Sequence, residues 1–123
     1  MLDHLSIQCA DVAASAAFYD SVLRTIGGRR IMDFGPVIGY GVPPMPDFWL
    51  GPRTTGEGTR EVHIAFRAPD RESVRAFFDA AVATGVDVLH KPAVRAEYHK
   101  SYYGAFVRDP DGSNVEAVCH APE

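Results

Sequence analysis

Two histidines and one glutamate have the residue types and the spacing of a metal site. His4, His63 and Glu116 each lie in a short run in which apolar and polar residues alternate. Two imidazoles and one carboxylate can supply three ligands on one side of a divalent cation and leave positions open for a substrate or water. A cation would also provide a partner for Glu116, a carboxylate in the middle of a predicted strand, because burying an unpaired carboxylate is costly.

Each of these residues also has a simpler interpretation. A histidine in a strand is most often only hydrogen-bonded, and a glutamate in a strand most often faces water. An internal repeat favours the metal site over these alternatives. At an offset of 59 residues the aligned pairs are His4 with His63, Asp11 with Asp70, and Phe18 with Phe77.

Two equivalent strands are expected to position the histidines. In residues 2–9 the alternation places three polar side chains on one face, namely His4, Ser6 and Gln8. In residues 62–67 the equivalent face carries His63, Ala65 and Arg67. Because side chains on a strand alternate with a period of two, the opposite faces are apolar and are expected to face the core.

Helices are expected to follow both strands. Asp11 and Asp70 can cap the helix N-termini, and the glycines at 27–28 and 85 can end them. Shorter strand candidates follow at 30–34, 37–42, 48–50 and 86–91, and residues 92–100 form a polar loop. A hairpin then turns at Asp-Pro-Asp-Gly, residues 109–112, and its last strand carries Glu116.

The predicted fold class is α+β, with two β-α-β-β-β repeats. We expect one domain over residues 1–123, with repeat one at about 1–51, a glycine-rich linker at 52–60 and repeat two at about 61–121. Neither repeat alone can bury both its helix and its sheet. We therefore predict a curved mixed sheet with the helices on the convex side and the histidines on the concave side.

Composition narrows the class of function. The chain has 123 residues, of which 46% are apolar and 23% charged, and its net charge of −4 gives no basic surface for nucleic acid or for a membrane. It contains no apolar run long enough to cross a bilayer and no signal-type leader, so we expect a cytoplasmic protein. Cys9 and Cys119 lie on apolar faces, which favours two buried thiols over a disulfide.

The repeat and three motifs resemble the vicinal oxygen chelate superfamily. The motifs are His-Leu-Ser-Ile at 4–7, Val-His-Ile-Ala-Phe at 62–66 and Phe-Val-Arg-Asp-Pro-Asp-Gly-Ser-Asn-Val-Glu at 106–116. This superfamily contains glyoxalase I, extradiol dioxygenases, fosfomycin-resistance thiol transferases and bleomycin-binding proteins. The resemblance implies metal ligands at His4, His63 and Glu116, a divalent cofactor such as Zn, Fe, Mn or Ni, and a homodimer whose sites are often built across subunits.

The branches of the superfamily differ at a few positions. Glyoxalase I carries a fourth metal ligand, a carboxylate, where this chain has Trp49, which cannot bind a metal. His99 matches a histidine of the extradiol dioxygenases, but their motif tyrosine falls on Phe106. The fosfomycin transferases carry a tryptophan like Trp49 and an active hydroxyl at the position of Ser6, although their potassium-binding loop has no clear match here.

Further polar and aromatic residues complete the candidate site. Gln8 and Arg67 share the polar faces of the histidine strands and can bind a substrate oxygen, or only pair with acids at the rim. We assign Ser6, Gln8, Trp49, Arg67, Tyr98 and Tyr102 to substrate binding. Glu116, His99 and Tyr103 are assigned to catalysis. The tyrosines at the start of a strand are equally explained by packing, and His90 and His120 are interpreted as structural.

The expected function is a metal-dependent enzyme acting on a small metabolite with two neighbouring oxygens. The reaction would be of the lyase, isomerase, transferase or dioxygenase type. The alternative is a metal-free dimer that binds a drug or metabolite in an aromatic crevice, in the manner of bleomycin resistance proteins.

Overall fold

The protein is described here by a computed structural model of residues 1–58 and 60–122. Residue 59, in the predicted linker, and residue 123, at the end of the predicted domain, lie outside the described residues. The first unit consists of β1 (Leu5–Cys9), α1 (Val12–Leu23), the short 3-10 helix η1 (Arg24–Ile26), β2 (Arg29–Asp33), β3 (Ile38–Gly41) and β4 (Phe48–Pro52). The second unit consists of β5 (His63–Arg67), α2 (Arg71–Ala83), β6 (Val88–Val94), β7 (Tyr103–Arg108) and β8 (Asn114–Cys119).

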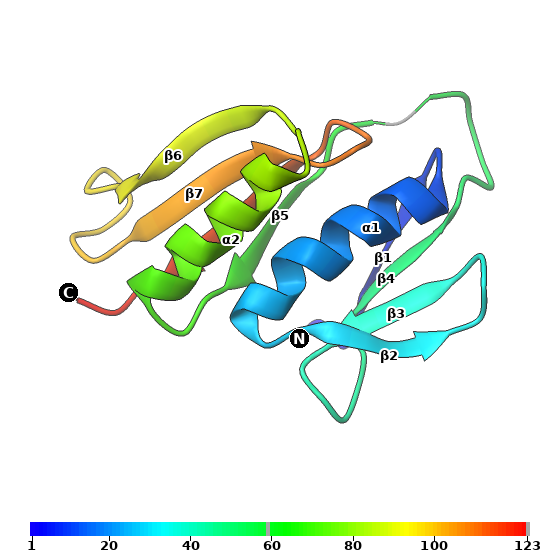
Figure 1. Ribbon diagram of the computed structural model, residues 1–123, viewed down its shortest axis with the longest axis horizontal. Coiled ribbons are helices and arrows are strands. Elements are labelled where there is room, and N and C mark those ends of the chain that lie inside the picture. Colours follow the sequence, from blue (N-terminus) through cyan, green and yellow to red (C-terminus); the bar gives the residue numbers. More distant parts are fainter. Residues whose placement is uncertain (59, 123) are drawn as a thin grey trace.

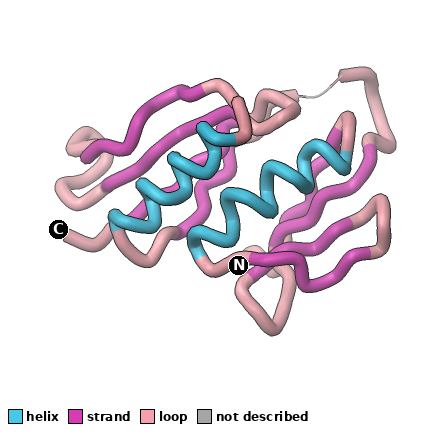
Figure 2. The backbone as a smooth tube through the Cα atoms, viewed as in Figure 1, coloured by secondary structure: helices cyan, strands magenta, loops and turns pink. Residues whose placement is uncertain are grey.

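The two units have the same topology, which confirms the predicted α+β fold class. Each forms a four-stranded sheet, with strand order β1-β4-β3-β2 in the first and β5-β8-β7-β6 in the second. In each sheet the first strand pairs in parallel with the last, β1 with β4 and β5 with β8, and the remaining pairs are antiparallel. Both helices lie side by side on one side of the two sheets (Figures 1 and 2). The opposite faces of the sheets are therefore free of helices.

The helices begin as predicted, and α1 ends at Leu23, with the 3-10 helix η1 between it and the predicted glycine stop at 27–28. The side chain of Asp11 accepts a hydrogen bond from the backbone N–H of Ala14 at 3.1 Å, and Asp70 accepts one from Ser73 at 2.7 Å. These caps satisfy N–H groups that have no partner within the helix. No helix among the described residues is both long enough and apolar enough to cross a membrane.

Strand β6 is longer than predicted. It continues through Pro92 to Val94, where a polar loop was expected from residue 92 onward. The proline is tolerated because β6 is the edge strand of its sheet, where one side of the backbone needs no ladder partner. Its pairing with β7 shifts register between His90 and Ala93, which accommodates the interruption.

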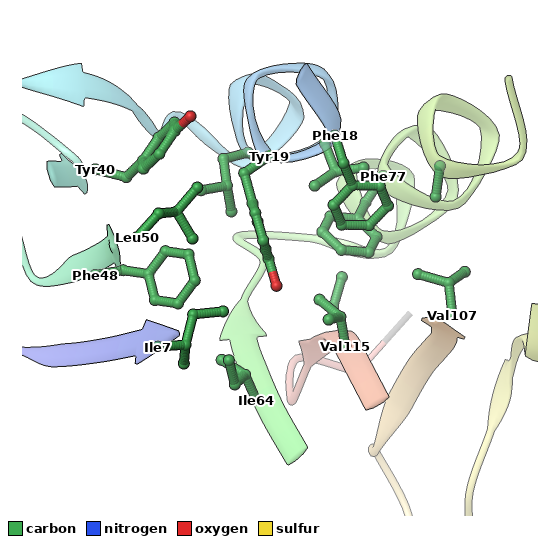
Figure 3. Packing of buried hydrophobic residues seen from close by; sticks show 14 of the residues in the cluster. Ile7, Phe18, Tyr19, Tyr40, Phe48, Leu50, Ile64, Phe77, Val107 and Val115 are labelled. Atoms are coloured by element: carbon green, nitrogen blue, oxygen red, sulfur yellow. The ribbon is translucent and has the colours of Figure 1, made fainter. Parts of the chain in front are cut away.

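One continuous core joins the two units under the helices. Tyr19 lies at its centre, between Phe48 of the first unit and Val115 of the second (Figure 3). The ring of Tyr19 is 4.9 Å from that of Phe48, and Phe48 is 5.1 Å from Phe66 of β5. Edge-to-face contacts of this kind add to the stability given by burial alone. Both cysteines are buried and free, as predicted.

The Asp-Pro-Asp-Gly turn between β7 and β8 also connects the units. Asp109 is buried and accepts hydrogen bonds from the backbone N–H groups of Asp111 and Ser113, both at 2.9 Å, and from the Tyr19 hydroxyl at 2.7 Å. Asp111 accepts a hydrogen bond from the backbone N–H of Ala10 at 3.0 Å. The turn of the second unit is thereby fixed to the start of helix α1.

Candidate functional site

Glu116 is fully buried on the face of β8 that the helices do not cover. Its neighbours Val115 and Ala117 face the core, so the carboxylate points to the opposite side of the sheet. It has two partners: Oε2 lies 2.9 Å from Nε2 of His63, and Oε1 accepts a hydrogen bond from the hydroxyl of Tyr102. The buried carboxylate, for which the sequence showed no obvious partner, is therefore paired within the chain.

Tyr102 holds its proton firmly in this arrangement. Burial, the hydrogen bond to Glu116 and the charge of that carboxylate, in this order, raise the pKa of Tyr102 above its usual value. The phenol is therefore the donor and the carboxylate the acceptor. His63 retains an exposed fraction of 53%, so solvent or a ligand can reach the pair from its side.

Gly104 provides the room for this contact. A Cβ atom at this position would lie 3.0 Å from Oε1 of Glu116 and 3.3 Å from Cε1 of Tyr102. A larger residue at this position would require the carboxylate or the phenol to shift.

The ring of Phe106 lies beside the carboxylate. It is the registered partner of Glu116 across β7 and β8. Three nitrogen-bearing side chains surround its ring: His63 at 6.0 Å, His90 edge-on at 5.4 Å, and the guanidinium of Arg95 at 5.5 Å. Neither His90 nor Arg95 was assigned to the site from the sequence. The alternation within β6 could have placed His90, whereas Arg95 lay in a segment predicted to be a loop.

A second aromatic group lies next to Tyr102. The rings of Tyr98 and His99 contact it at 4.9 and 5.5 Å, and His120 contacts it at 5.3 Å. Nε2 of His99 lies 2.7 Å from Nδ1 of His120, and Nδ1 of His99 accepts a hydrogen bond from the backbone N–H of Ser101. That bond assigns the proton of neutral His99 to Nε2, so His99 donates to His120. Of the predicted site residues, Tyr98, Tyr102 and His99 are thus brought together near Glu116.

Tyr103 lies on the other face of the sheet. Its ring contacts the guanidinium groups of Arg71 and Arg75 on helix α2 at 4.9 and 5.9 Å, and its hydroxyl is 3.4 Å from Nη1 of Arg75. Tyr103 also packs against the hydrophobic core. The catalytic role assigned to it from the sequence stays a prediction, and the geometry places Tyr102, not Tyr103, beside the carboxylate.

Ser6 and Gln8 line a cavity that reaches His63. The cavity has a volume of about 570 Å³ and lies between β1 and β5. Gln8 donates a hydrogen bond to Oγ1 of Thr54 at 3.0 Å. Arg53 and Arg60 also line the cavity, and sequence analysis had placed both only in a glycine-rich linker. Their charge makes this cavity suited to a polar ligand.

Trp49 and Arg67 lie apart from Glu116. Trp49 pairs with Ser6 across β4 and β1, stacks on Phe34 at 6.3 Å, and covers Gly39, where a Cβ atom would lie 2.8 Å from its ring. Arg67, at the end of β5, lines a second cavity of about 290 Å³. The structure therefore does not gather all the predicted substrate-binding residues around one point.

His4 lies at the far end of the neighbouring strand from His63. It precedes β1, its side chain is 58% exposed, and its Nδ1 is 2.6 Å from Asp3. The end of β1 lies beside the start of β5, because Gln8 and His63 line one cavity. The start of β1 lies beside the end of β5. The backbone carbonyl of Asp47 accepts a hydrogen bond from the N–H of Leu5, and Asp47 lines the other cavity together with Arg67. Equivalent residues of the two units therefore lie at opposite ends of antiparallel strands.

The described residues contain no group of three or more His, Cys, Asp or Glu side chains arranged to hold a metal ion. One copy of the chain brings together two of the three predicted ligands, His63 and Glu116. An imidazole and a carboxylate are a suitable donor pair for a divalent metal. The donor set of this chain fits a metal at this place only if a further ligand is added.

Comparison with known proteins identifies the class to which the fold and this site belong. The Glyoxalase/Bleomycin resistance protein/Dioxygenase superfamily matches residues 1–117, and the chain belongs to this superfamily. Its members typically use divalent metals. No curated protein matches the sequence.

Solved structures share the fold over nearly the whole chain. A glyoxalase/bleomycin resistance protein from Albidiferax ferrireducens is 25% identical, with a TM-score of 0.81 over 94% of this chain and 96% of that one. A family enzyme from Burkholderia phytofirmans is 19% identical, with a TM-score of 0.73 over 98% of both chains. A fosfomycin resistance protein from Mesorhizobium loti is 15% identical, with a TM-score of 0.69 over 98% of this chain and 92% of that one.

Proposed function

We propose that the protein is a divalent-metal-dependent enzyme that acts on a small metabolite with two neighbouring oxygens. The observation that carries this proposal is the fully buried Glu116, whose carboxylate lies 2.9 Å from Nε2 of His63 and accepts a hydrogen bond from Tyr102. A buried carboxylate next to an accessible histidine is typical of catalytic sites.

His63 and Glu116 would hold the metal, which when bound supplies Lewis-acid polarisation of a substrate oxygen. Tyr102 keeps its proton and donates its hydrogen bond to Glu116, and Glu116 can accept a proton from the substrate and return it. The raised pKa of Tyr102 keeps the phenol protonated at neutral pH, so it can donate to a developing oxyanion. A lyase, an isomerase, a transferase or a dioxygenase could each use the pair of Glu116 and Tyr102.

The third ligand would come from His4 of a second copy, in a symmetric homodimer. His4 is exposed and lies at the opposite end of the neighbouring strands β1 and β5 from His63, so it cannot reach the site of its own chain. Exposed apolar side chains on the first unit support an interface, with Phe34, Val42 and Met45 each about two-thirds exposed. A closed dimer of this kind contains two equivalent sites.

Metal content provides the direct test of this function. Protein purified without chelator or affinity tag is expected to contain a divalent metal, and His63→Ala is expected to lower the metal affinity by at least about tenfold, because a direct ligand is lost. His90→Ala is the matched control, because His90 contacts Phe106 and not Glu116. Elemental analysis that gives equal metal content in the wild type and in His63→Ala contradicts the proposal.

Subunit mixing tests whether the site is shared. His4→Ala and Glu116→Gln are each expected to bind little metal, but co-refolding them should restore about a quarter of the wild-type sites, because half of the randomly formed dimers carry one intact site. The dimer itself is checked by light scattering at micromolar concentration. A monomer mass, or an absence of recovery in proven mixed dimers, argues against a shared site.

A metal-free binding protein is the second candidate. Glu116 already has two hydrogen-bond partners without an ion, and the Trp49–Phe34 stack offers an aromatic surface, with Phe34 67% exposed. These features suit a planar drug or metabolite. Binding of such a ligand that is unaffected by chelator would favour this candidate.

A further inference from the structure

Arg95 is a cation beside the candidate site to which the proposed metal chemistry gives no role. It follows directly after β6, and its backbone N–H donates to the carbonyl of Tyr102 at 2.7 Å. This bond fixes the start of the Arg95 side chain next to the phenol that contacts Glu116. The guanidinium lies over the ring of Phe106 at 5.5 Å, and the side chain is only 22% exposed.

The guanidinium of Arg95 is incompletely paired. Its Nε is buried and has no hydrogen-bond partner among the described residues. Its ion-pair partner is Glu97, whose Oε1 is 3.5 Å from Nη1 and whose side chain is 59% exposed. Such a contact at the surface contributes little, and an unsatisfied buried donor is a cost to the folded protein. A carboxylate bound at the partly exposed terminal nitrogens of Arg95 would give this guanidinium the strong partner that it lacks.

The side chains around the Phe106 ring differ in charge. Glu116 is the neighbour of Phe106 across the strand pair and carries its partners His63 and Tyr102, and the cationic Arg95 lies over the ring. A second anion placed next to Glu116 would be repelled, whereas an anion at Arg95 would be attracted. The hydroxyl or carbonyl end of a ligand therefore suits Glu116, and its anionic end suits Arg95.

We propose that Arg95 binds the carboxylate of the substrate, and that the substrate is a small, flat hydroxy- or oxo-carboxylic acid. Guanidinium groups match the planar geometry of a carboxylate. Tyr98, which is 61% exposed and whose ring lies 4.9 Å from that of Tyr102, offers a flat aromatic surface for the body of the ligand. The inference rests on the proposed function, since it places the reacting oxygens of that substrate at His63 and Glu116.

The test uses 3-hydroxybenzoate and its neutral analogue 3-hydroxybenzamide as probes, titrated into metal-stripped protein in excess chelator and followed by NMR. The wild type is expected to bind the acid at least about tenfold more tightly than the amide, because a charge-assisted hydrogen bond is lost with the amide. Arg95→Gln should weaken the acid by about tenfold to a hundredfold and leave the amide within about twofold. Arg95→Lys should recover part of the affinity because it keeps the charge.

Arg29→Gln is the matched control, because Arg29 is an exposed strand arginine of the other sheet. It should bind both probes as the wild type does. The inference is overturned if the wild type binds neither probe or does not prefer the acid, if Arg95→Gln binds the acid unchanged, or if Arg29→Gln loses as much. Since no metal is present, these results are independent of whether the metal site of the proposed function exists.

Discussion

Asp109→Ala is expected to lower the free energy of unfolding by about 3–5 kcal/mol, because it removes three hydrogen bonds to a buried carboxylate. The backbone N–H groups of Asp111 and Ser113 and the hydroxyl of Tyr19 lose their acceptor together. Tyr19 and Ser113 are themselves buried, so water cannot replace the carboxylate without opening the core. A loss of this size is a large part of the stability of an ordinary domain. Urea unfolding followed by circular dichroism measures it.

Two milder variants separate the contacts of Asp109. Asp109→Asn keeps an oxygen for the two backbone N–H groups, and Tyr19→Phe removes only the hydroxyl donor, so each should cost about 1 kcal/mol. If Asp109→Ala costs no more than Tyr19→Phe, the turn does not hold the two units together.

The same residue makes stability depend on pH. Burial raises the pKa of Asp109 above its usual value of 3.8, against the lowering effect of its hydrogen bonds. In the window between the usual pKa and the raised pKa, the folded state binds more protons than the unfolded state, so Asp109 makes stability fall as pH rises through that window. Asp109→Asn should remove this part of the pH dependence, and the difference between the two unfolding profiles measures it.

The fold was accessible from the sequence because its signals are local. Asp11 and Asp70 are local caps of the helices that follow them. The period of two separates Glu116 from its neighbours Val115 and Ala117, which pack in the core. The repeat then gave the topology, since a unit that cannot bury its own apolar faces must pair with its copy. The same alternation explains why Glu116 lies on the face without helices.

The composition of the site was less accessible, because it depends on how the elements are placed relative to one another. The repeat aligned His4 with His63, but aligned residues of two antiparallel strands lie at opposite ends, so the alignment alone could not bring them together. Tyr102 and Tyr103 are adjacent in sequence, and only the register of β7 on β8 decides which of them faces Glu116. The position of Arg95 depends on the pairing of the edge strand β6 with β7. In the sequence, the proline indicated that this strand ends before Arg95.

Glu116→Gln is the second variant with a large expected effect, and it separates the enzyme from the binding protein. In the metal-free chain the amide can keep both contacts, with its oxygen accepting from Tyr102 and its NH₂ group donating to Nε2 of a His63 tautomer protonated at Nδ1. The stability of the metal-free variant should therefore stay within about 1 kcal/mol of the wild type. Any larger difference that appears only with metal reports on the metal site and not on the fold.

With metal present, the expected loss is large because an amide is a poorer ligand than a carboxylate and cannot accept the proton of the substrate. Metal affinity should fall by about a hundredfold or more. At a metal concentration of about a hundred times the wild-type Kd, binding contributes about 2.7 kcal/mol, or a rise of about 10 °C in Tm for a chain of this size. Chelator should therefore lower the Tm of the wild type to that of Glu116→Gln and leave the variant unchanged. A different result favours the metal-free binding protein: chelator changes neither melting curve, and the variant melts at or above the wild-type Tm. Replacing the carboxylate by an amide lowers the stability through lost metal binding only if the carboxylate holds an ion.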